Sequence, residues 1–566
     1  MASVTHVSEK YSDFISRVEQ GRVRIPHFQR NFVWELKASA KLVDSMLKGY
    51  PIGTFILWQT KEELRSVRSI GNLTFIDHKS GESVYYILDG QQRITSFFAA
   101  ITGANISRER GKIDDFSNIY IDLRATEDND IVITETKDLP EKSYIKVTEL
   151  INGNFTLLSS FPNEYHEILS KYQNNIRGWN FNITYLNDAK IDVATDVFTR
   201  LNVGGKTLTL FEIMVAKTYQ APKEVILINE EPKTDNGFDL LDSYNNLIEE
   251  LKISKYDTIS PSTVLQVMSI LLVRGCTRKQ ILELEKKEFI SIWSDATKAI
   301  KACVDYFRTF GIPVSELLPY NALIVPFSYF FYKHSNPPNG TMQERLEDFF
   351  WRCSLGSRYS SGVENKIAND IHKMDSILEN KLPYYEWSIS ISADELIRNG
   401  WFGTGRSFVK GLLCLYALQK PKSFHNHFDV LIDNSWLKKS TSKNYHHFFP
   451  IAFMKREYPT MDYWRYNHIL NITIVDDYLN KRIIRDKAPA RYITEIGASN
   501  AKLKESLTTH IIGDFEVFGI ENNDYDKFLN ARAFAVSQEL EKRIIKTIET
   551  GNEFQNPEDE SEGDID

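Results

Sequence analysis

The sequence predicts an α+β protein with several domains, and three observations support this fold class. Its 566 residues allow two to four domains at about 150 residues each. Short strand and helix patterns alternate as far as residue 220, and long helical patterns dominate from about residue 235 to 430. A histidine pair with strand-forming neighbours follows in the last part. We therefore place domains at 1–220, 221–430 and 431–555, with an acidic tail at 556–566.

The first domain begins with strand and helix signals in an α/β order. Apolar residues recur at helical spacing over 36–47, and Gly49 and Pro51 end that pattern before a strand at 54–58. A second strand at 84–88 breaks at Asp89-Gly90 and passes into a helix from 91 to 98. Residues 120–123 predict another strand, and the segment 196–205 is expected to lead into a second turn. A capping box formed by Thr209 and Glu212 begins the next helix.

The C-terminal part contains the most specific residue pattern, Asn444-Tyr445-His446-His447-Phe448-Phe449-Pro450, followed by Asn471 and, nine residues later, Asn480. Phosphodiester hydrolysis needs a base for water, a cation that stabilises charge on the phosphate, and a group that orients the base. We expect His446 and Asn480 to hold the metal, His447 to be the base and Asn471 to orient it. The alternative is that these are ordinary surface or turn residues.

Three basic residues follow directly and are candidates for binding DNA phosphates: Lys481, Arg482 and Arg485. The segment as a whole resembles the HNH, or ββα-metal, nucleases, whose motif pairs a ligand with a catalytic histidine, then has Asn and Asn or His. That resemblance implies His446 as ligand and His447 as base. Many relatives have an acidic residue at the position of His446, and a nitrogen ligand moves the preference from Mg²⁺ toward Mn²⁺ or Ni²⁺.

A second pattern lies at the predicted strand-to-helix junction and consists of Asp89, Gly90, Gln91, Gln92 and Arg93. Backbone N–H groups at a helix start favour anions, and a planar guanidinium can clamp a phosphate. The alternative is an Asp-Gly turn whose carboxylate caps the helix. A P-loop at 204–207 is rejected because Arg200 stands where Walker A requires glycine.

The order of motifs in this half resembles the N-terminal domain of GmrSD-type restriction proteins, which is similar to ParB and sulfiredoxin folds. The resemblance rests on three segments: Pro26-x-Phe28-Gln29-Arg30 with Trp34, Asp89 to Arg93, and Phe198-x-Arg200-Leu201-Asn202-x-Gly204-Gly205. It implies nucleotide binding or hydrolysis at Asp89–Arg93 with Gln29 and Arg30, using a nucleoside triphosphate. It also implies coupling to a C-terminal HNH nuclease that attacks modified foreign DNA.

Composition is compatible with these expectations. The net charge is -8, and six acidic residues in the last nine leave -2 for the remainder, so a DNA partner is not excluded. The four separated cysteines and the lack of a long apolar segment predict a cytoplasmic protein with no membrane partner. A homodimer is one allowed assembly. In the helical middle, Trp351-Arg352 and Arg358-Tyr359 are expected on solvated helix faces, with DNA contact as the alternative.

Together these features predict an anti-phage DNA endonuclease with a metal-dependent HNH site and an NTPase-type N-terminal domain. The alternative function is a nucleotide-binding, DNA-binding regulator whose nuclease is vestigial.

Overall fold

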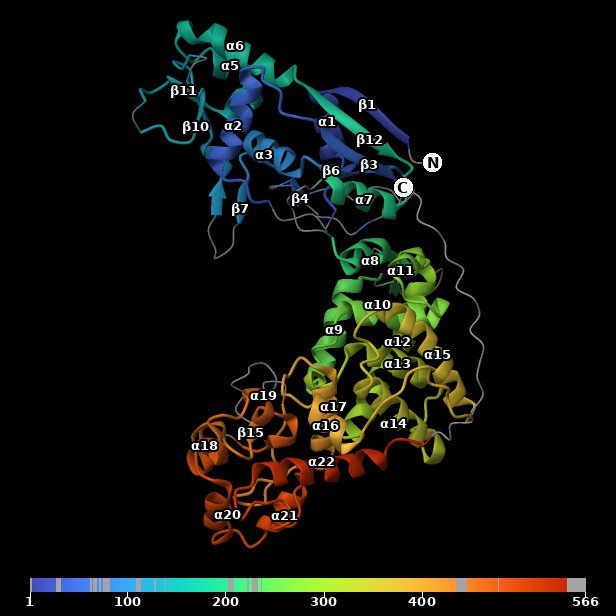
Figure 1. The fold of residues 1–566 in the computed structure, drawn as a ribbon. Helices are drawn as coiled ribbons and strands as arrows, with labels where there is room; N and C mark the ends of the chain where they lie inside the picture. The colour runs from blue at the N-terminus through green and yellow to red at the C-terminus, as the bar shows by residue number, and fades with distance from the viewer. Residues whose placement is uncertain are drawn as a thin grey trace, which may run out of the picture. The chain divides into compact units, whose positions relative to one another are not determined.

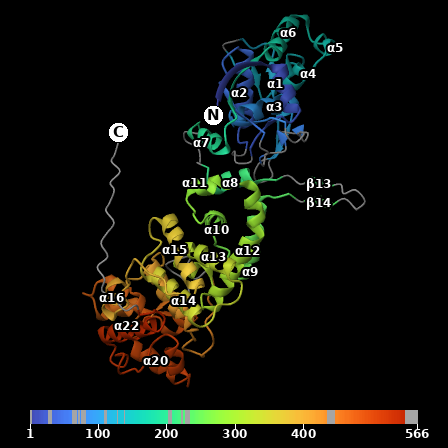
Figure 2. The ribbon, with the colours of Figure 1, turned by 90° about the vertical axis from the view of Figure 1, so that its right-hand side faces the viewer.

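The computed structural model separates into two compact units (Figures 1 and 2). Unit 1 comprises residues 1–245 and 285–290, and unit 2 comprises 246–284 and 291–566. The described residues are 3–26, 32–61, 64, 69–70, 73–74, 82–107, 113–126, 129–137, 139–201, 208–220, 223–225, 233–235, 237–433, 445–476 and 478–546. The predicted acidic tail lies outside them. No helix among the described residues is long and apolar enough to cross a membrane.

Unit 1 is built on a mixed five-stranded sheet. Its strands, in spatial order, are β1 (Ser3–Lys10), β12 (Asn180–Asn187), β3 (Phe55–Thr60), β6 (Val84–Asp89) and β2 (Val23–Arg24). The central strands β3 and β6 are antiparallel, with Leu57 opposite Ile87, and their side chains are largely buried. Strands that are buried on both faces usually consist of consecutive apolar residues, and the sequences of β3 and β6 are largely of this kind. The predicted strands at 54–58 and 84–88 are confirmed.

Helices pack against this sheet and complete one apolar core. They are α1 (Tyr11–Glu19), α2 (Leu36–Leu47), α3 (Gln91–Thr102), α4 (Val147–Asn152), α6 (Asn163–Arg177) and α7 (Ile191–Leu201). The helices α5 (Phe155–Leu158) and α8 (Leu210–Thr218) also belong to this unit. In both views α1, α2 and α3 lie together beside the sheet. Val43, Met46 and Phe98 are fully buried among them. The predicted helices at 36–47 and 91–98 are confirmed, and Thr209 and Glu212 form the predicted capping box.

Smaller strand pairs complete the β-structure of unit 1: β4 (Ser69–Ile70), β5 (Leu73–Thr74), β7 (Asn105–Ser107), β8 (Ile113–Asp115), β9 (Tyr120–Asp122), β10 (Val132–Ile133), β11 (Tyr144–Lys146), β13 (Lys223–Val225) and β14 (Lys233–Asp235). The predicted strand at 120–123 is β9, the middle strand of a three-stranded sheet. The segment 196–205, which was expected to lead into a turn, is helical over 196–201 as the end of α7. Ile191, Ala194 and Phe198 form a buried stripe at helical spacing, which explains the helix. Residues 202–205 lie outside the described part.

Unit 2 begins with a helical assembly, as predicted for the middle of the chain. Its helices are α9 (Leu240–Ile253), α10 (Pro261–Val273), α11 (Arg278–Glu283), α12 (Lys286–Thr309), α13 (Ile324–Lys333), α14 (Gly340–Leu355), α15 (Val363–Leu378), α16 (Ala393–Asn399) and α17 (Ser407–Leu418); α9 and α12 begin in unit 1. Phe327, Phe350 and Leu412 are among its fully buried side chains. All four cysteines are buried and unpaired.

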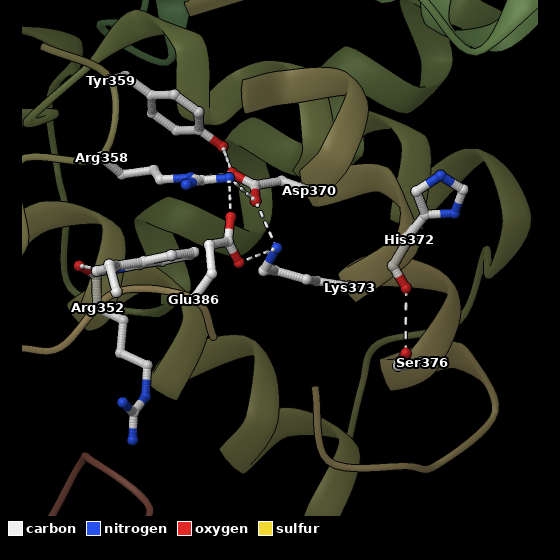
Figure 3. Close-up of polar contacts among 9 residues, drawn as sticks. Arg352, Arg358, Tyr359, Asp370, His372, Lys373, Ser376 and Glu386 are labelled. Carbon is white, nitrogen blue, oxygen red and sulfur yellow. Dashed lines mark hydrogen bonds and ion pairs between the residues drawn. The ribbon is translucent and has the colours of Figure 1, made fainter. Parts of the chain in front are cut away.

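The helical assembly contains a buried charge cluster where the sequence predicted solvated faces (Figure 3). Asp370 is fully buried and accepts hydrogen bonds from Arg358 and from the hydroxyl of Tyr359. Lys373 contacts the same carboxylate at 3.2 Å, and Glu386 contacts both cations. Both predicted placements of Arg358-Tyr359, on a solvated face or against DNA, are therefore wrong. The prediction failed because the partners lie 12 and 28 residues away.

Trp351-Arg352 is also buried, and Arg352 pairs with the fully buried Asp348 at 2.9 Å. The same two side chains bind the backbone of Ile545, beyond the last helix: Asp348 accepts from its N–H and Arg352 donates to its carbonyl. Solvated and DNA-contacting placements are wrong here too. These contacts attach the end of the C-terminal segment to α14.

The C-terminal segment combines two short strands with helices that surround them. Its elements are β15 (Tyr445–His447), α18 (Ile451–Glu457), α19 (Tyr463–Tyr466), η6 (Ile469–Asn471), β16 (Ile472–Ile474), η7 (Leu479–Ile484), α20 (Pro489–Gly497), α21 (Leu503–Thr508) and α22 (Tyr525–Glu541). β15 and β16 are antiparallel, with His446 opposite Thr473. In Figure 1, α22 passes between α16 and the pair α20 and α21, and it contacts α16 and η6.

Candidate functional site

The predicted C-terminal residues come together around the β15–β16 pair. His446 is buried on β15, and its Nδ1 lies 3.0 Å from Oδ1 of Asn480 on η7. Its other nitrogen, Nε2, is buried and has no hydrogen-bond partner. Burial, with smaller effects from His447 and His510, lowers the His446 pKa to about 3, so the ring is neutral at pH 7. An imidazole nitrogen and an amide oxygen are both atoms that can act as ligands of a metal ion.

These donors fit a divalent cation that keeps part of its water shell. In the structure these two atoms bond to each other, and because the amide oxygen only accepts, Nδ1 of His446 carries the proton. An ion held by both would have to replace this hydrogen bond, while Nε2 has no protein partner. Among the residues described, no cluster of three or more His, Cys, Asp or Glu side chains could hold a metal. His446 and Asn480 would therefore share the ion with water or substrate oxygens.

His447 is the next residue on β15, and its side chain has a different environment. It is half-buried, and its Nε2 lies 2.9 Å from Oδ1 of Asn467, the residue just after α19. Burial lowers the His447 pKa, against a smaller opposite effect of Asn467. The imidazole is therefore unprotonated at neutral pH, which is the state a general base requires.

Asn471 does not contact His447 in this structure. Its Oδ1 accepts from the N–H of Phe449 at 2.8 Å, and its Nδ2 donates to the carbonyls of Phe449 and Tyr466. The amide is thus fully engaged in fixing the turn after β15. The expected direct orientation of His447 by Asn471 is corrected to Asn467; a role of Asn471 in catalysis stays a prediction.

The predicted phosphate-binding residues Lys481, Arg482 and Arg485 are exposed, and they follow Asn480 in and just after η7. Their positions place positive charge on the same short element as one candidate metal ligand. Binding of phosphates by these side chains stays a prediction.

The sequence analysis did not identify several residues that hold the backbone around the candidate site in place. Arg532 of α22 is fully buried and donates to the carbonyls of Leu470 and His510. Tyr492 donates to the carbonyl of Phe448, directly after the histidine pair. These partners lie tens of residues from the motif, so no local spacing could identify them. Asn467 is closer, but nothing in the sequence distinguishes it from other asparagines.

His468, another histidine near the pair, has contacts of a structural kind. Its Nε2 lies 2.9 Å from the carbonyl of Ile397, and its Nδ1 accepts from the N–H of Leu470. Both ring nitrogens are satisfied only in the neutral form. Burial lowers the His468 pKa to about 4, and Arg406 and Arg532 add smaller effects in the same direction.

We therefore expect His468 to destabilise the protein in acid. The unfolded chain binds this proton near pH 6.5, and the folded chain only near pH 4, so stability falls as pH falls through that window and is unaffected above it. The slope due to one such proton is at most about 1.4 kcal/mol per pH unit. The free energy of unfolding is measured with urea at several pH values from 7.5 to 4.5. It should fall more steeply with falling pH in wild type than in His468→Gln; an equal pH dependence would contradict the assignment.

The N-terminal candidate residues gather at the start of α3, but they mainly contact one another and the backbone. Arg93 pairs with Asp89 at 2.8 Å and donates to the carbonyls of Ile52 and Thr54. Its guanidinium also lies over the ring of Phe55, 4.9 Å from the centroid. Three of its five donors are therefore in use within the protein. A phosphate clamp would need the remaining donors or a rearrangement.

Glycine is required at two positions around this arginine. Gly90 has φ +94°, and a Cβ there would lie 2.4 Å from Phe55 Cδ1; a Cβ at Gly53 would lie 2.2 Å from Arg93 Nη1. Gly90 precedes α3, which has no side-chain cap. The alternative in which Asp89 caps this helix is therefore wrong, because its carboxylate turns to Arg93. The first-turn N–H groups keep the anion-favouring end of the helix.

The two glutamines are buried behind this junction. Gln92 accepts from the N–H groups of Val33 and Trp34 at 2.9 and 3.4 Å, which ties the segment after Pro26 to α3. Gln91 also faces the interior and lies 3.4 Å from Gln92. Gln29 and Arg30 lie outside the described residues. Arg200, part of the third resembling segment, is exposed and pairs with Asp196.

Comparisons with known proteins match this arrangement in the first unit. Residues 11–219 match the family model described as "GmrSD restriction endonuclease, N-terminal domain". The chain is also 25% identical to an uncharacterized protein of Methanocaldococcus jannaschii, with 92% of this chain and 94% of that protein covered. The similarity to that protein thus extends through both units.

Proposed function

We propose that the protein is a metal-dependent DNA endonuclease that restricts modified foreign DNA in antiviral defence. One observation carries the chemistry: Nδ1 of His446 and Oδ1 of Asn480 lie 3.0 Å apart, beside the neutral His447, on an antiparallel strand pair followed by a short helix. Two strands followed by a helix that carry these residues are what a ββα nuclease site of the HNH kind requires, and this supports the proposal. The restriction role and the DNA substrate are supported by the family match over residues 11–219.

In this proposal His447 takes a proton from water, whose oxygen attacks phosphorus while the bond to the leaving oxygen breaks. His446 and Asn480 would hold the divalent ion in place of their mutual hydrogen bond, and the ion would supply positive charge for the phosphate and the leaving oxygen. Lys481, Arg482 and Arg485 bind neighbouring phosphates and position the strand. Asn471 keeps the turn after β15 in the conformation that presents both histidines.

We further propose that the N-terminal domain, bounded near residue 220, binds or hydrolyses a nucleoside triphosphate and controls cleavage. Asp89, Gly90, Gln91, Gln92 and Arg93, with Gln29 and Arg30, would form its site. The N-terminal end of α3 favours negative charge, which supports an anion there, and the family match covers all of these residues. The helical middle would end near residue 430, and the nuclease would follow from 431.

Metal removal tests the nuclease directly. The full chain is incubated with modified and unmodified phage DNA, with and without nucleoside triphosphates, after treatment with EDTA. We expect no cleavage in EDTA and restored cleavage on adding Mn²⁺, Ni²⁺ or Mg²⁺, because His446 and Asn480 provide the ligands. The amount of DNA fragments on gels, followed over time, gives the rate.

Two results would count against this proposal. Cleavage that continues in EDTA would exclude the metal-dependent mechanism. DNA binding without cleavage under every condition would favour the alternative, a nucleotide-binding DNA regulator with a vestigial nuclease.

A further inference from the structure

Asn467 forms the side-chain hydrogen bond to the proposed base, His447. It follows α19 and lies four residues before Asn471, outside the resembling motif. Its Oδ1 lies 2.9 Å from Nε2 of His447. A hydrogen bond of this length can be made in either sense by a neutral imidazole, so its direction decides which ring nitrogen carries the proton.

A second contact fixes the orientation of the Asn467 amide. Its Nδ2 donates to the carbonyl of Phe402 at 3.4 Å, and the backbone N–H of Phe402 donates to the carbonyl of Asn467 at 2.8 Å. A carbonyl oxygen can only accept, so the amide nitrogen must face Phe402 and the amide oxygen must face His447. Because that oxygen also only accepts, Nε2 of His447 carries the proton and Nδ1 keeps its lone pair.

The partner of Asn467 belongs to a well-fixed loop between α16 and α17, which we define as residues 399–406. Arg406 donates to the carbonyls of Asn399 and Trp401 at 2.8 and 2.7 Å, and its guanidinium lies 4.0 Å from the centre of the Trp401 ring. The carbonyl of Gly400 accepts from Ile469 at 2.7 Å. Loop 399–406 is therefore joined to Asn467 and to Ile469, two residues later.

Close packing at Gly400 limits movement of this loop. A Cβ at that position would lie 2.2 Å from Cε1 of His468, whose ring is itself bound at both nitrogens. The ring of Phe402 also packs against Tyr445 and His447, with centroid separations of 5.3 and 6.5 Å. Asn467 is thus held on one side by the helical part of unit 2 and contacts the candidate site on the other.

We propose that Asn467 is a positioning residue that, held by loop 399–406, keeps His447 protonated at Nε2 and leaves Nδ1 free to accept the proton from water. This inference rests on the proposed nuclease function. It deepens that function by assigning the reacting nitrogen, and it connects the helical part of unit 2 to the chemistry.

The test compares three variants of the full chain. Asn467→Leu keeps the approximate volume but removes the acceptor, Asn467→Asp keeps an oxygen acceptor, and Asn500→Leu removes a buried amide that bonds to Phe424 and does not contact His447. We expect Asn467→Leu to lower kcat about 10- to 100-fold with KM for DNA unchanged, as for other groups that orient a functional side chain. Asn467→Asp should retain most of kcat, and Asn500→Leu should leave it unchanged.

A spectroscopic measurement gives an answer without any cleavage. Nitrogen-15 shifts of histidine-labelled protein, with His447 assigned from His447→Gln, report which ring nitrogen is protonated at pH 7.5. We expect Nε2–H in wild type and a mixture of tautomers in Asn467→Leu. An Nδ1–H tautomer in wild type would overturn the proposal, even if Asn467→Leu failed to fold.

The outcomes separate this inference from the function on which it depends. If His447→Ala abolishes cleavage but Asn467→Leu keeps the wild-type kcat, Asn467 is not a positioning residue and the nuclease proposal stands. If kcat falls equally in Asn467→Leu, Asn467→Asp and Asn500→Leu, the effect is general loss of structure and the positioning role is refuted. If no cleavage depends on His447, the nuclease proposal itself fails.

Discussion

His447→Ala is expected to lower the cleavage rate by about 10²- to 10⁴-fold while DNA binding stays near the wild-type level. General-base catalysis contributes rate factors of that size. His447 is half-buried, whereas His446 is buried. Its partial burial still keeps the pKa of His447 below the ordinary value. Single-turnover cleavage gives the rate, and gel-shift titration gives the affinity.

The control for this variant is His372→Ala. His372 is an exposed histidine on α15, and Figure 3 shows its ring pointing away from the neighbouring charge cluster. We expect this variant to cleave like wild type. Full cleavage by His447→Ala would instead exclude this imidazole as the base, and equal losses of binding and cleavage would point to damaged folding.

The contact between His446 and Asn480 could be predicted from the sequence because the order of the motif residues along the strand and the helix determines where their side chains lie. A strand that presents adjacent side chains on opposite faces separates His446 from His447, and a following helix brings Asn480 back to the strand. The contact between Asn467 and His447 was not predictable in this way. It depends on the conformation of the segment between β15 and β16 and on Phe402, which comes from a different part of the chain.

The periodicity of apolar residues predicted α2 and the helical region between about 235 and 430 well, because burial of one helix face is recorded locally. It failed for charged residues. Arg358 has the sequence context of a solvated helix end, yet its carboxylate partners lie on α15 and on the segment after it. Local patterns identify where apolar side chains recur, but whether a cation is buried depends on a partner that only the tertiary fold supplies.

Asp370→Ala is therefore expected to destabilise unit 2 by about 3–5 kcal/mol, the usual cost of removing one partner from a buried ion pair. Asp370 is fully buried, and Arg358 bonds to it through Nε and Nη2 at 3.0 and 2.9 Å. Without it, Arg358 and Lys373 would remain buried with Glu386 as their shared carboxylate. Their desolvation would be poorly compensated, because Glu386 is 42% exposed and screened by water.

Two further variants separate lost attraction from buried charge. Glu386→Gln removes the exposed carboxylate, so we expect a cost of no more than about 1 kcal/mol. In Arg358→Met with Asp370→Leu, two of the buried charges are removed together, and stability should recover part of the loss. Urea unfolding, with hydrogen exchange in α14 and α15, measures each effect. If Asp370→Ala and Glu386→Gln lower the free energy of unfolding by the same amount, the prediction is wrong. Burial of Asp370 would then give it no larger role in this cluster than the exposed Glu386.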